Sequence, residues 1–240
     1  MSVSQGTINL QDGNVGNYGD IIKHAALLQL SKYFFSLDGH KTYLDTHCYL
    51  TRSQLANHNW TNEVACLIQH YPLYQEYAHL QQTYIDRGEY LCSSGIVLQY
   101  SGNAELLLSE SNVQTRLALQ QQLLEYDARV TVKDDMMQWH EHITGNNNLF
   151  VLLDPFKLTD ENWAAVTLSL AKGLSETGRG LMLTFDYDKS TEQPIWPKAP
   201  TGWSGPVARF DHAPYHLAAY STPQIKHEVM QMLSPLGWAA

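Results

Sequence analysis

Segments typical of strands and segments typical of helices alternate along this 240-residue chain, and that alternation constrains its fold more than any other feature. Short apolar or alternating stretches predict strands at 41–47, 104–111, 128–135, 149–154, 180–187 and 215–221. Apolar residues with helical spacing predict helices at 20–35, 112–126, 136–143, 160–176 and 223–238. Strands that alternate with helices indicate an α/β fold with a doubly wound, mostly parallel sheet.

Two stretches interrupt this alternation. Residues 50–90 are rich in Gln, Tyr, His and Leu with helical spacing and a break at Pro72, which predicts a helical insertion after the first strand. Six prolines between 194 and 223 predict a loop there. No internal repeat occurs. We therefore expect a single domain over 1–240 with an insertion subdomain at 50–90, and we place Asp20 as the N-cap of the first helix.

Composition narrows the class of protein. With 44% hydrophobic and 16% charged residues, the chain is expected to form a packed core. It has no run of 18 apolar residues and no signal-peptide pattern, so we expect no membrane span. Three cysteines without a C-x-x-C pair indicate reduced thiols in the cytoplasm and argue against a zinc site. His140 and His142 do not share a helix face, so we expect no metal there.

The net charge of the chain indicates which kind of binding partner to expect. The chain carries 15 basic and 24 acidic residues, a formal charge of −9. Proteins that hold RNA need lysine and arginine to neutralise phosphates, so this balance disfavours RNA, although eleven histidines soften the conclusion. A small-molecule or nucleobase-containing partner is the expectation that fits the charge better.

Polar side chains follow four of the predicted strands, at the edge where such sheets bind ligands. They are Asp45, His47, Glu110, Asp134, Asp135 and Asp154. A carboxylate after the second strand can accept hydrogen bonds from ribose hydroxyls. A carboxylate after the third strand can accept a hydrogen bond from the exocyclic amine of adenine. This pattern favours a nucleoside cofactor, S-adenosylmethionine (SAM) or a dinucleotide, and the missing glycine-rich turn counts against the dinucleotide. The competing interpretation of each acid is a cap on the next helix.

Four stretches in order carry a resemblance to a known family. They are GNYGDIIKHAALLQL (16–30), YLDTH (43–47), ARVTVKDD (128–135) and LLDP (152–155). In these the chain resembles the 23S rRNA adenine-N6 methyltransferases of the RlmJ type, from about residue 14 to the C-terminus. The GNxxDxxKH signature at 16–24 is the most specific part. The resemblance implies a Rossmann-like class I SAM-dependent methyltransferase fold with a seven-stranded sheet and a helical insertion after the first strand.

The resemblance also implies roles for individual residues. SAM contacts are implied for Lys23, His24, Asp45 and His47, with Glu110 on the ribose and Asp134 and Asp135 near the adenine. Asp154 takes the catalytic place, with Pro155 and Phe156 beside it, and Asn17 and Lys157 are implied to contact the substrate. The carboxylate of Asp154 would accept a hydrogen bond from the target amine, which is positioning and electrostatics rather than covalent catalysis. Without the signature, Lys23 and His24 are better explained as a solvated helix face.

The chain departs from the family in three places. Cys48-Tyr49-Leu50-Thr51 replaces a turn that bears glycine, and we expect these bulky residues to crowd the methionine end of SAM. Phe156-Lys157 replaces the proline and the base-stacking tyrosine, and Gln11 and Asn14 replace histidines. Two hypotheses follow. The first is an active SAM-dependent N-methyltransferase that acts either on an adenine in RNA, which the charge disfavours, or on a smaller acceptor. The second is a divergent member or pseudoenzyme that uses the same cleft for binding, as a partner subunit or for other chemistry.

Overall fold

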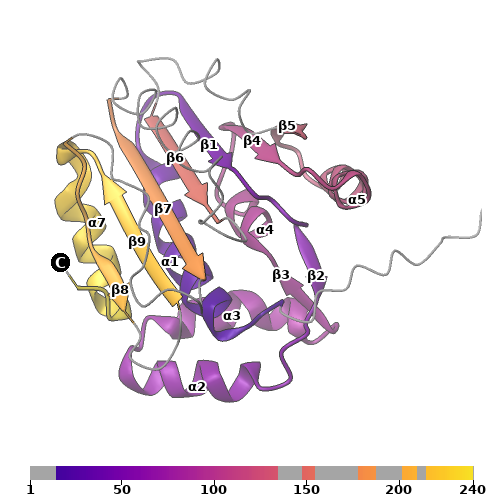
Figure 1. Cartoon of the computed structure of the whole chain (residues 1–240), viewed down its shortest axis with the longest axis horizontal. Helices are drawn as coiled ribbons and strands as arrows, with labels where there is room; N and C mark the ends of the chain where they lie inside the picture. Colours follow the sequence, from indigo (N-terminus) through magenta and orange to yellow (C-terminus); the bar gives the residue numbers. More distant parts are fainter. Residues whose placement is uncertain (1–14, 135–147, 155–177, 188–201, 210–214, 240) are drawn as a thin grey trace, which may run out of the picture.

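The centre of the molecule is a seven-stranded sheet (Figure 1). The structure is a computed structural model, and it describes residues 15–134, 148–154, 178–187, 202–209 and 215–239. Along the sheet the strands are β5 (Arg129–Lys133), β4 (Glu105–Ser109), β1 (Lys41–Asp45), β6 (Asn148–Leu153), β7 (Gly180–Tyr187), β9 (Tyr215–Ser221) and β8 (Val207–Arg209). The first five are parallel, and β9 is antiparallel to both of its neighbours. The predicted mostly parallel sheet is confirmed.

The strand sequences follow from where each strand lies. β6 is central and covered on both faces, and its five residues from Leu149 to Leu153 are at most 1% exposed, as expected for a continuous apolar run. β5 lies at the edge, and its residues alternate between exposed and half-buried. Successive side chains point to opposite faces, so Tyr43 belongs to the main hydrophobic core and Leu44 to a second cluster on the other face.

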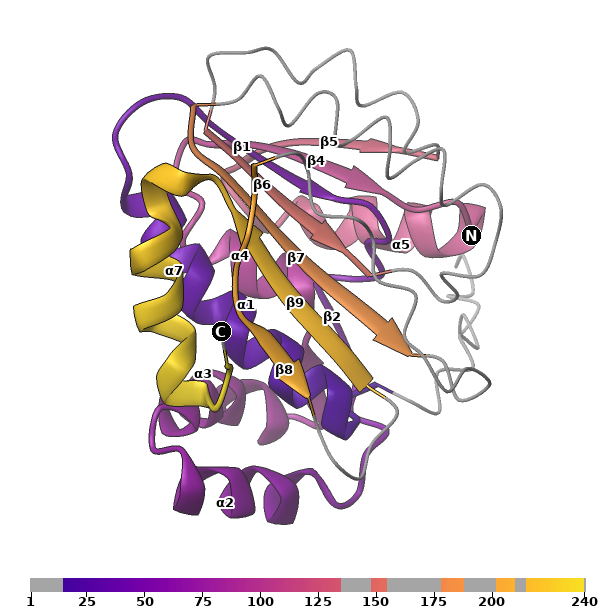
Figure 2. The same cartoon turned by 60° about the vertical axis from the view of Figure 1, so that its left-hand side comes forward.

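Helices α1 (Tyr18–Ser36), α4 (Ser93–Leu98) and α7 (Lys226–Leu233) supply the main core on one face of the sheet (Figure 2). The 3-10 helices η2 (Pro223–Ile225) and η3 (Ser234–Leu236) flank α7. α1 contacts both α4 and α7. Helix α5 (Val113–Leu123) lies between β4 and β5 in the sequence, and Asn112 caps it by accepting the backbone N–H groups of Gln114 and Thr115.

The expected N-cap of the first helix was wrong. Asn17 is the N-cap, and its side-chain oxygen accepts the backbone N–H of Asp20 at 3.0 Å. Asp20 instead lies in the first turn and accepts the N–H of Gly16 at 3.0 Å. A carboxylate in the first turn can accept a backbone N–H from before the helix, and it lies near the positive end of the helix dipole. An acid therefore stabilises the first turn as well as the N-cap position.

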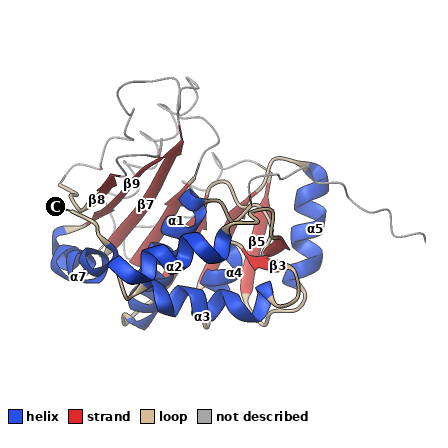
Figure 3. Ribbon diagram, turned by 90° about the horizontal axis from the view of Figure 1, so that it is seen from below, coloured by secondary structure: helices blue, strands red, loops and turns tan. Residues whose placement is uncertain are grey.

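Between β1 and β4 the chain forms α2 (Trp60–His70) and α3 (Tyr74–Ile85), seen together in Figure 3, which agree with the helical spacing of residues 50–90. The same stretch also forms a small antiparallel pair, β2 (Arg52–Gln54) with β3 (Glu89–Leu91), which the pattern did not indicate. Gln122 joins this pair to helix α5. Its side chain accepts the backbone N–H of Thr51 and donates to the carbonyl of Arg52, both at 2.9 Å.

Other differences concern short elements. Helix α4 was not predicted, and it has only six residues. The stretch 194–223, predicted as a loop, contains β8, the first residue of η2, and β9, which had been predicted separately. Trp203 from this stretch packs in the second core cluster. The predicted helices at 136–143 and 160–176 lie outside the described residues.

Candidate functional site

The order of the strands reverses at β1. From β1 the chain passes to β4 on one side, and β6 later fills the other side, so the carboxyl ends of β1 and β6 border the place where doubly wound sheets bind ligands. Asp45 is the last residue of β1 and lies opposite Leu152, and Asp154 directly follows β6. The topology therefore brings two of the predicted site residues together.

Lys23 joins helix α1 to this edge of the sheet. Its ammonium donates to the carboxylate of Asp154 at 2.5 Å and lies 2.9 Å from the carboxylate of Asp20. The Lys23 side chain is 6% exposed, and those of Asp20 and Asp154 are 17% and 19% exposed. A shielded cation thus bridges two carboxylates, one from the first turn of α1 and one from the end of β6.

The pKa values of this network follow from burial and charge. Burial alone would lower the pKa of Lys23, but Asp154 and Asp20 outweigh it and raise the pKa above its usual value. Burial would raise the pKa of Asp20, and Lys23 lowers it below the usual value. For Asp154 burial prevails over Lys23, and its pKa is raised. Asp154 therefore remains an oriented acceptor with more affinity for a proton than an exposed aspartate.

Asp45 is fully buried beside this network. Its carboxylate accepts hydrogen bonds from the Ser93 hydroxyl at 3.0 Å, the Tyr43 hydroxyl at 3.3 Å and the backbone N–H of His47 at 3.2 Å. Burial and the nearby Asp154 carboxylate raise the pKa of Asp45 to about 7. Asp45 thus orders the end of β1 from within the protein.

His47 is half-buried immediately after β1. Its Nδ1 lies 2.9 Å from the hydroxyl of Thr46, which also donates to the carbonyl of Leu152 at 3.1 Å and so ties the ends of β1 and β6 together. Burial lowers the pKa of His47 to about 4, so the imidazole is neutral at pH 7. A neutral ring offers a hydrogen bond to a ligand without adding charge.

Two further acids lie at the ends of the neighbouring strands. The Glu110 carboxylate follows β4 and accepts the backbone N–H of Asn112 at 2.6 Å. Asp134 follows β5, is exposed, and lies 3.8 Å from the guanidinium of Arg116. The backbone N–H of Glu110 bonds the carbonyl of Lys133 at 2.9 Å, which keeps the two strand ends adjacent. These acids are therefore neighbours on one side of Asp45, while Asp154 lies on the other.

Two predicted residues, His24 and Asn17, make structural contacts in and around helix α1. His24 is 3% exposed, and its Nδ1 lies 2.8 Å from the hydroxyl of Tyr90, which in turn lies 2.7 Å from that of Tyr77. Its ring faces the 50–90 stretch, and burial lowers its pKa to about 3. Asn17 caps α1. Their predicted ligand contacts stay predictions. Asp135, Pro155, Phe156 and Lys157 lie outside the described residues.

The turn after β1 bears on whether SAM fits. Cys48 and Leu50 belong to the main hydrophobic core, and Thr51 is fully buried. The expected crowding therefore does not arise from these three side chains, because they pack inward. Gly95 of α4 makes this possible: a Cβ there would lie 2.1 Å from the carbonyl oxygen of Thr51. Glu110 and Asp134, acceptors at the ends of two adjacent strands, fit the ribose and adenine of the nucleoside part of SAM.

Sequence reasoning missed four residues that shape this site: Asp20, Tyr43, Ser93 and Arg116. Asp20 was a detectable member, since it stands inside the GNxxDxxKH signature. Ser93 reaches Asp45 from 48 residues away, across the whole of the 50–90 stretch, and no local pattern reports such a contact.

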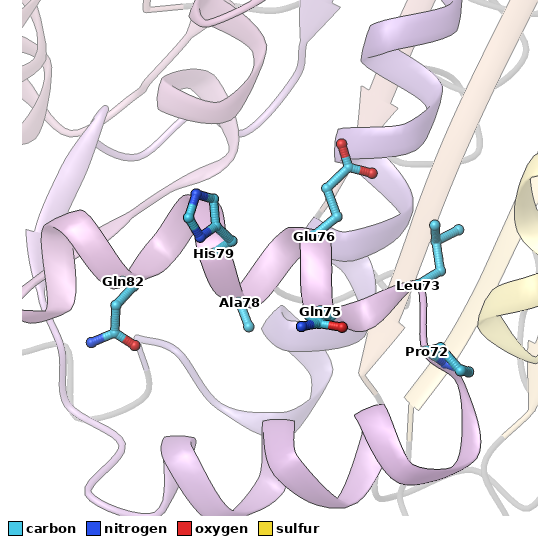
Figure 4. Close-up of a pocket in the computed structure, with 7 residues that line it drawn as sticks. All are labelled: Pro72, Leu73, Gln75, Glu76, Ala78, His79 and Gln82. Atoms are coloured by element: carbon cyan, nitrogen blue, oxygen red, sulfur yellow. The ribbon is translucent and has the colours of Figure 1, made fainter.

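A shallow depression of about 610 Å³ lies along α3, lined by Pro72, Leu73, Gln75, Glu76, Ala78, His79 and Gln82 (Figure 4). It contains none of the predicted site residues. Among the described residues there is no group of three His, Cys, Asp or Glu side chains that could hold a metal ion. In the same part of the chain, no helix has the length and apolar character needed to cross a membrane.

Comparisons with known proteins agree with the fold. Neither protein-family models nor curated protein sequences match the chain. A crystal structure of protein LPL1258 from Legionella pneumophila strain Philadelphia 1, described under the family DUF519, is similar with a TM-score of 0.61 and 16% identity over 92% of both chains. An rRNA methylase from Streptococcus thermophilus has a TM-score of 0.42 and 11% identity over 84% of this chain and 94% of that one.

A third structure is Escherichia coli yhhF, provisionally designated a methyltransferase, with a TM-score of 0.44 and 14% identity over 85% of this chain and 86% of that one. Similarity at these identities concerns the fold. The parallel strands, with β9 antiparallel between β7 and β8, form a doubly wound, Rossmann-like α/β fold, and the predicted α/β class is confirmed.

Proposed function

We propose that this chain is a SAM-dependent methyltransferase that transfers a methyl group to an amine nitrogen of a nucleobase-containing or other small acceptor. The observation that carries the proposal is the position of Asp154: it follows the central strand at the point where the strand order reverses, and Lys23 orients it. The resemblance to RlmJ-type enzymes supports a catalytic role for Asp154, because it implies an acid at this position.

SAM would supply an activated methyl group, and the protein's own residues would orient the two reactants. Glu110 and Asp134 would accept hydrogen bonds from the ribose and the adenine, since they follow the strands next to β1. Asp154 would accept a hydrogen bond from the acceptor amine, which aims the nitrogen lone pair at the methyl group. Its raised pKa suits it to this task, because the carboxylate holds the amine proton more strongly than an exposed acid.

The charges of the described residues support a small acceptor over a long RNA. The chain has a net charge of −9, and Lys23, Lys32, Arg52 and Arg116 all lie within 4 Å of a carboxylate. Cations already neutralised by acids contribute little to phosphate binding. An amine on a free nucleobase or nucleoside requires no such basic surface.

Calorimetric titration with S-adenosylhomocysteine tests the proposal first, and no heat of binding at near-millimolar ligand would overturn it. The second step follows transfer of labelled methyl to nucleosides and to deproteinised rRNA. In this assay Asp154→Ala should lower the rate by about 100-fold or more, the loss typical of removing one oriented polar group from a transition state. Asp127→Ala, at an exposed turn residue, is the matched control and should leave the rate unchanged.

A second candidate is a protein that binds the cofactor without transferring its methyl group. The tight ion pair between Lys23 and Asp154 favours it, because the carboxylate is already occupied. The same two measurements separate the candidates: a binding protein takes up S-adenosylhomocysteine and shows no transfer to any acceptor.

A further inference from the structure

Arg116 is the cation at the edge of the site where Glu110 and Asp134 meet. It lies in α5, and its side chain is 19% exposed. One guanidinium nitrogen donates to the backbone carbonyl of Glu110 at 2.7 Å and to that of Ser111 at 3.3 Å. The other nitrogen lies 3.8 Å from the carboxylate of Asp134. One side chain thus reaches the segments that follow β4 and β5.

The contacts to the two carbonyls fix the direction of the Glu110 side chain. Glu110 belongs to a turn of three residues between β4 and α5, so its backbone has no regular secondary structure of its own. Its N–H bonds Lys133, its carbonyl bonds Arg116, and its carboxylate accepts the N–H of Asn112. With the backbone anchored at both polar groups, the carboxylate is held in one place.

The charge of Arg116 matters as well. Glu110 and Asp134 follow adjacent strands, and the guanidinium of Arg116, 3.8 Å from the Asp134 carboxylate, offsets part of the negative charge that the two acids bring there. A guanidinium suits this place because its planar set of donors can bond two carbonyls while its charge lies beside a carboxylate, which a lysine ammonium on a flexible stem cannot do with the same geometry.

We propose that Arg116 is the positioning residue for the nucleoside half of the cofactor: it holds Glu110 for the ribose hydroxyls and Asp134 for the adenine amine. The proposal rests on the proposed SAM-dependent function and deepens it. Arg116 itself contacts neither the ribose nor the adenine in this arrangement, so its effect reaches the ligand through the two acids.

Binding of ligand analogues tests this role by calorimetry. The probes are S-adenosylhomocysteine, its 2′-deoxyribose analogue, which lacks one partner of Glu110, and S-inosylhomocysteine, which lacks the adenine amine. The unaltered protein should prefer S-adenosylhomocysteine to each analogue by about tenfold or more, the usual cost of losing a hydrogen bond to a charged group. In Arg116→Met, both preferences should fall to about threefold or less, and Arg116→Lys should recover part of the preference that depends on Asp134.

The control is Arg129→Met, which removes an exposed arginine from the opposite end of β5 and should keep both preferences. A thermal unfolding scan of each variant shows whether it folds, and a general loss of folding lowers the affinity for all three probes without changing their ratio. Arg116→Met with unchanged ratios would overturn the inference alone. Absence of S-adenosylhomocysteine binding in the unaltered protein would overturn the proposed function and this inference together.

Discussion

Replacing Lys23 by methionine should destabilise the fold strongly, because the side chain stands between two shielded carboxylates. The variant keeps the length of the stem and removes the charge 2.5 Å from Asp154 and 2.9 Å from Asp20. Breaking a buried ion pair from one side costs about 3–5 kcal/mol. At roughly 2–4 °C per kcal/mol for a chain of this size, the unfolding midpoint should fall by about 6–20 °C.

Lys32→Met provides the matched control. Lys32 pairs with Glu76 on the surface, where the side chains are 40% and 39% exposed, and exposed pairs contribute about 0–1 kcal/mol. Thermal unfolding and urea unfolding at pH 7, both followed by circular dichroism, measure the midpoint and the free energy of unfolding of both variants. A loss of stability in Lys23→Met no larger than that in Lys32→Met would refute the argument that the network is shielded from solvent.

The pH dependence of Lys23→Met gives an independent check. Without the cation, the pKa values of Asp20 and Asp154 should both lie above the unfolded value, so the folded state binds more protons than the unfolded state between those values. Stability should then rise more steeply than that of the unaltered protein as the pH falls from 7 to 5. Adding Asp154→Asn should recover part of the lost stability, because it removes one of the two unpaired charges. A variant whose stability does not change over this pH range would contradict the pKa reasoning.

Two further predictions follow from the same part of the fold. The pKa of Asp45 is raised to about 7, so its contribution to the free energy of unfolding is fully present below the unfolded pKa of 3.8 and is lost as the pH rises through 7. Asp45→Asn should therefore flatten the fall in the free energy of unfolding between pH 5 and pH 7.5. An unchanged slope in this variant would contradict the assignment. Gly95→Ala should cost about 3 kcal/mol or more in urea unfolding, because its Cβ would meet a backbone carbonyl at 2.1 Å, whereas Gly178→Ala has no neighbour within 4 Å and should stay within about 0.5 kcal/mol.

The sequence predicts the sheet well because each long strand has a recognisable pattern of apolar residues within its own few positions. The unbroken apolar run of β6 indicates a strand buried on both faces, and the alternation in β5 indicates a strand with one face more exposed. The intervening helices indicate that the strands are parallel. The same logic places Asp45 and Asp154 at one edge. β8 and the β2–β3 pair, each with strands of three residues, are too short to show a period, and the six-residue α4 is likewise too short.

The candidate site was predicted less completely, because its contacts are long-range. Lys23 and Asp154 are 131 residues apart, and only the resemblance suggested that both belong to the site. Adjacent residues of the signature also point in different directions. The Lys23 side chain contacts Asp154 at the end of β6, whereas the His24 side chain contacts Tyr90. Neighbours on a helix differ by about 100° in direction, so a motif fixes which residues matter but not what each one faces.

The chain of hydroxyl contacts from His24 to Tyr90 and Tyr77 has an evolutionary consequence. Because these buried groups fasten α1 to β3 and α3, one turn of α1 is anchored on one side by phenol hydroxyls and on the other by Asp154. The exposed residues of α2 and α3 take no part in this anchoring, and surface substitutions usually change stability by less than about 0.5 kcal/mol. The outer faces of these helices can therefore diversify among descendants of this protein while the position of Asp154 is inherited unchanged.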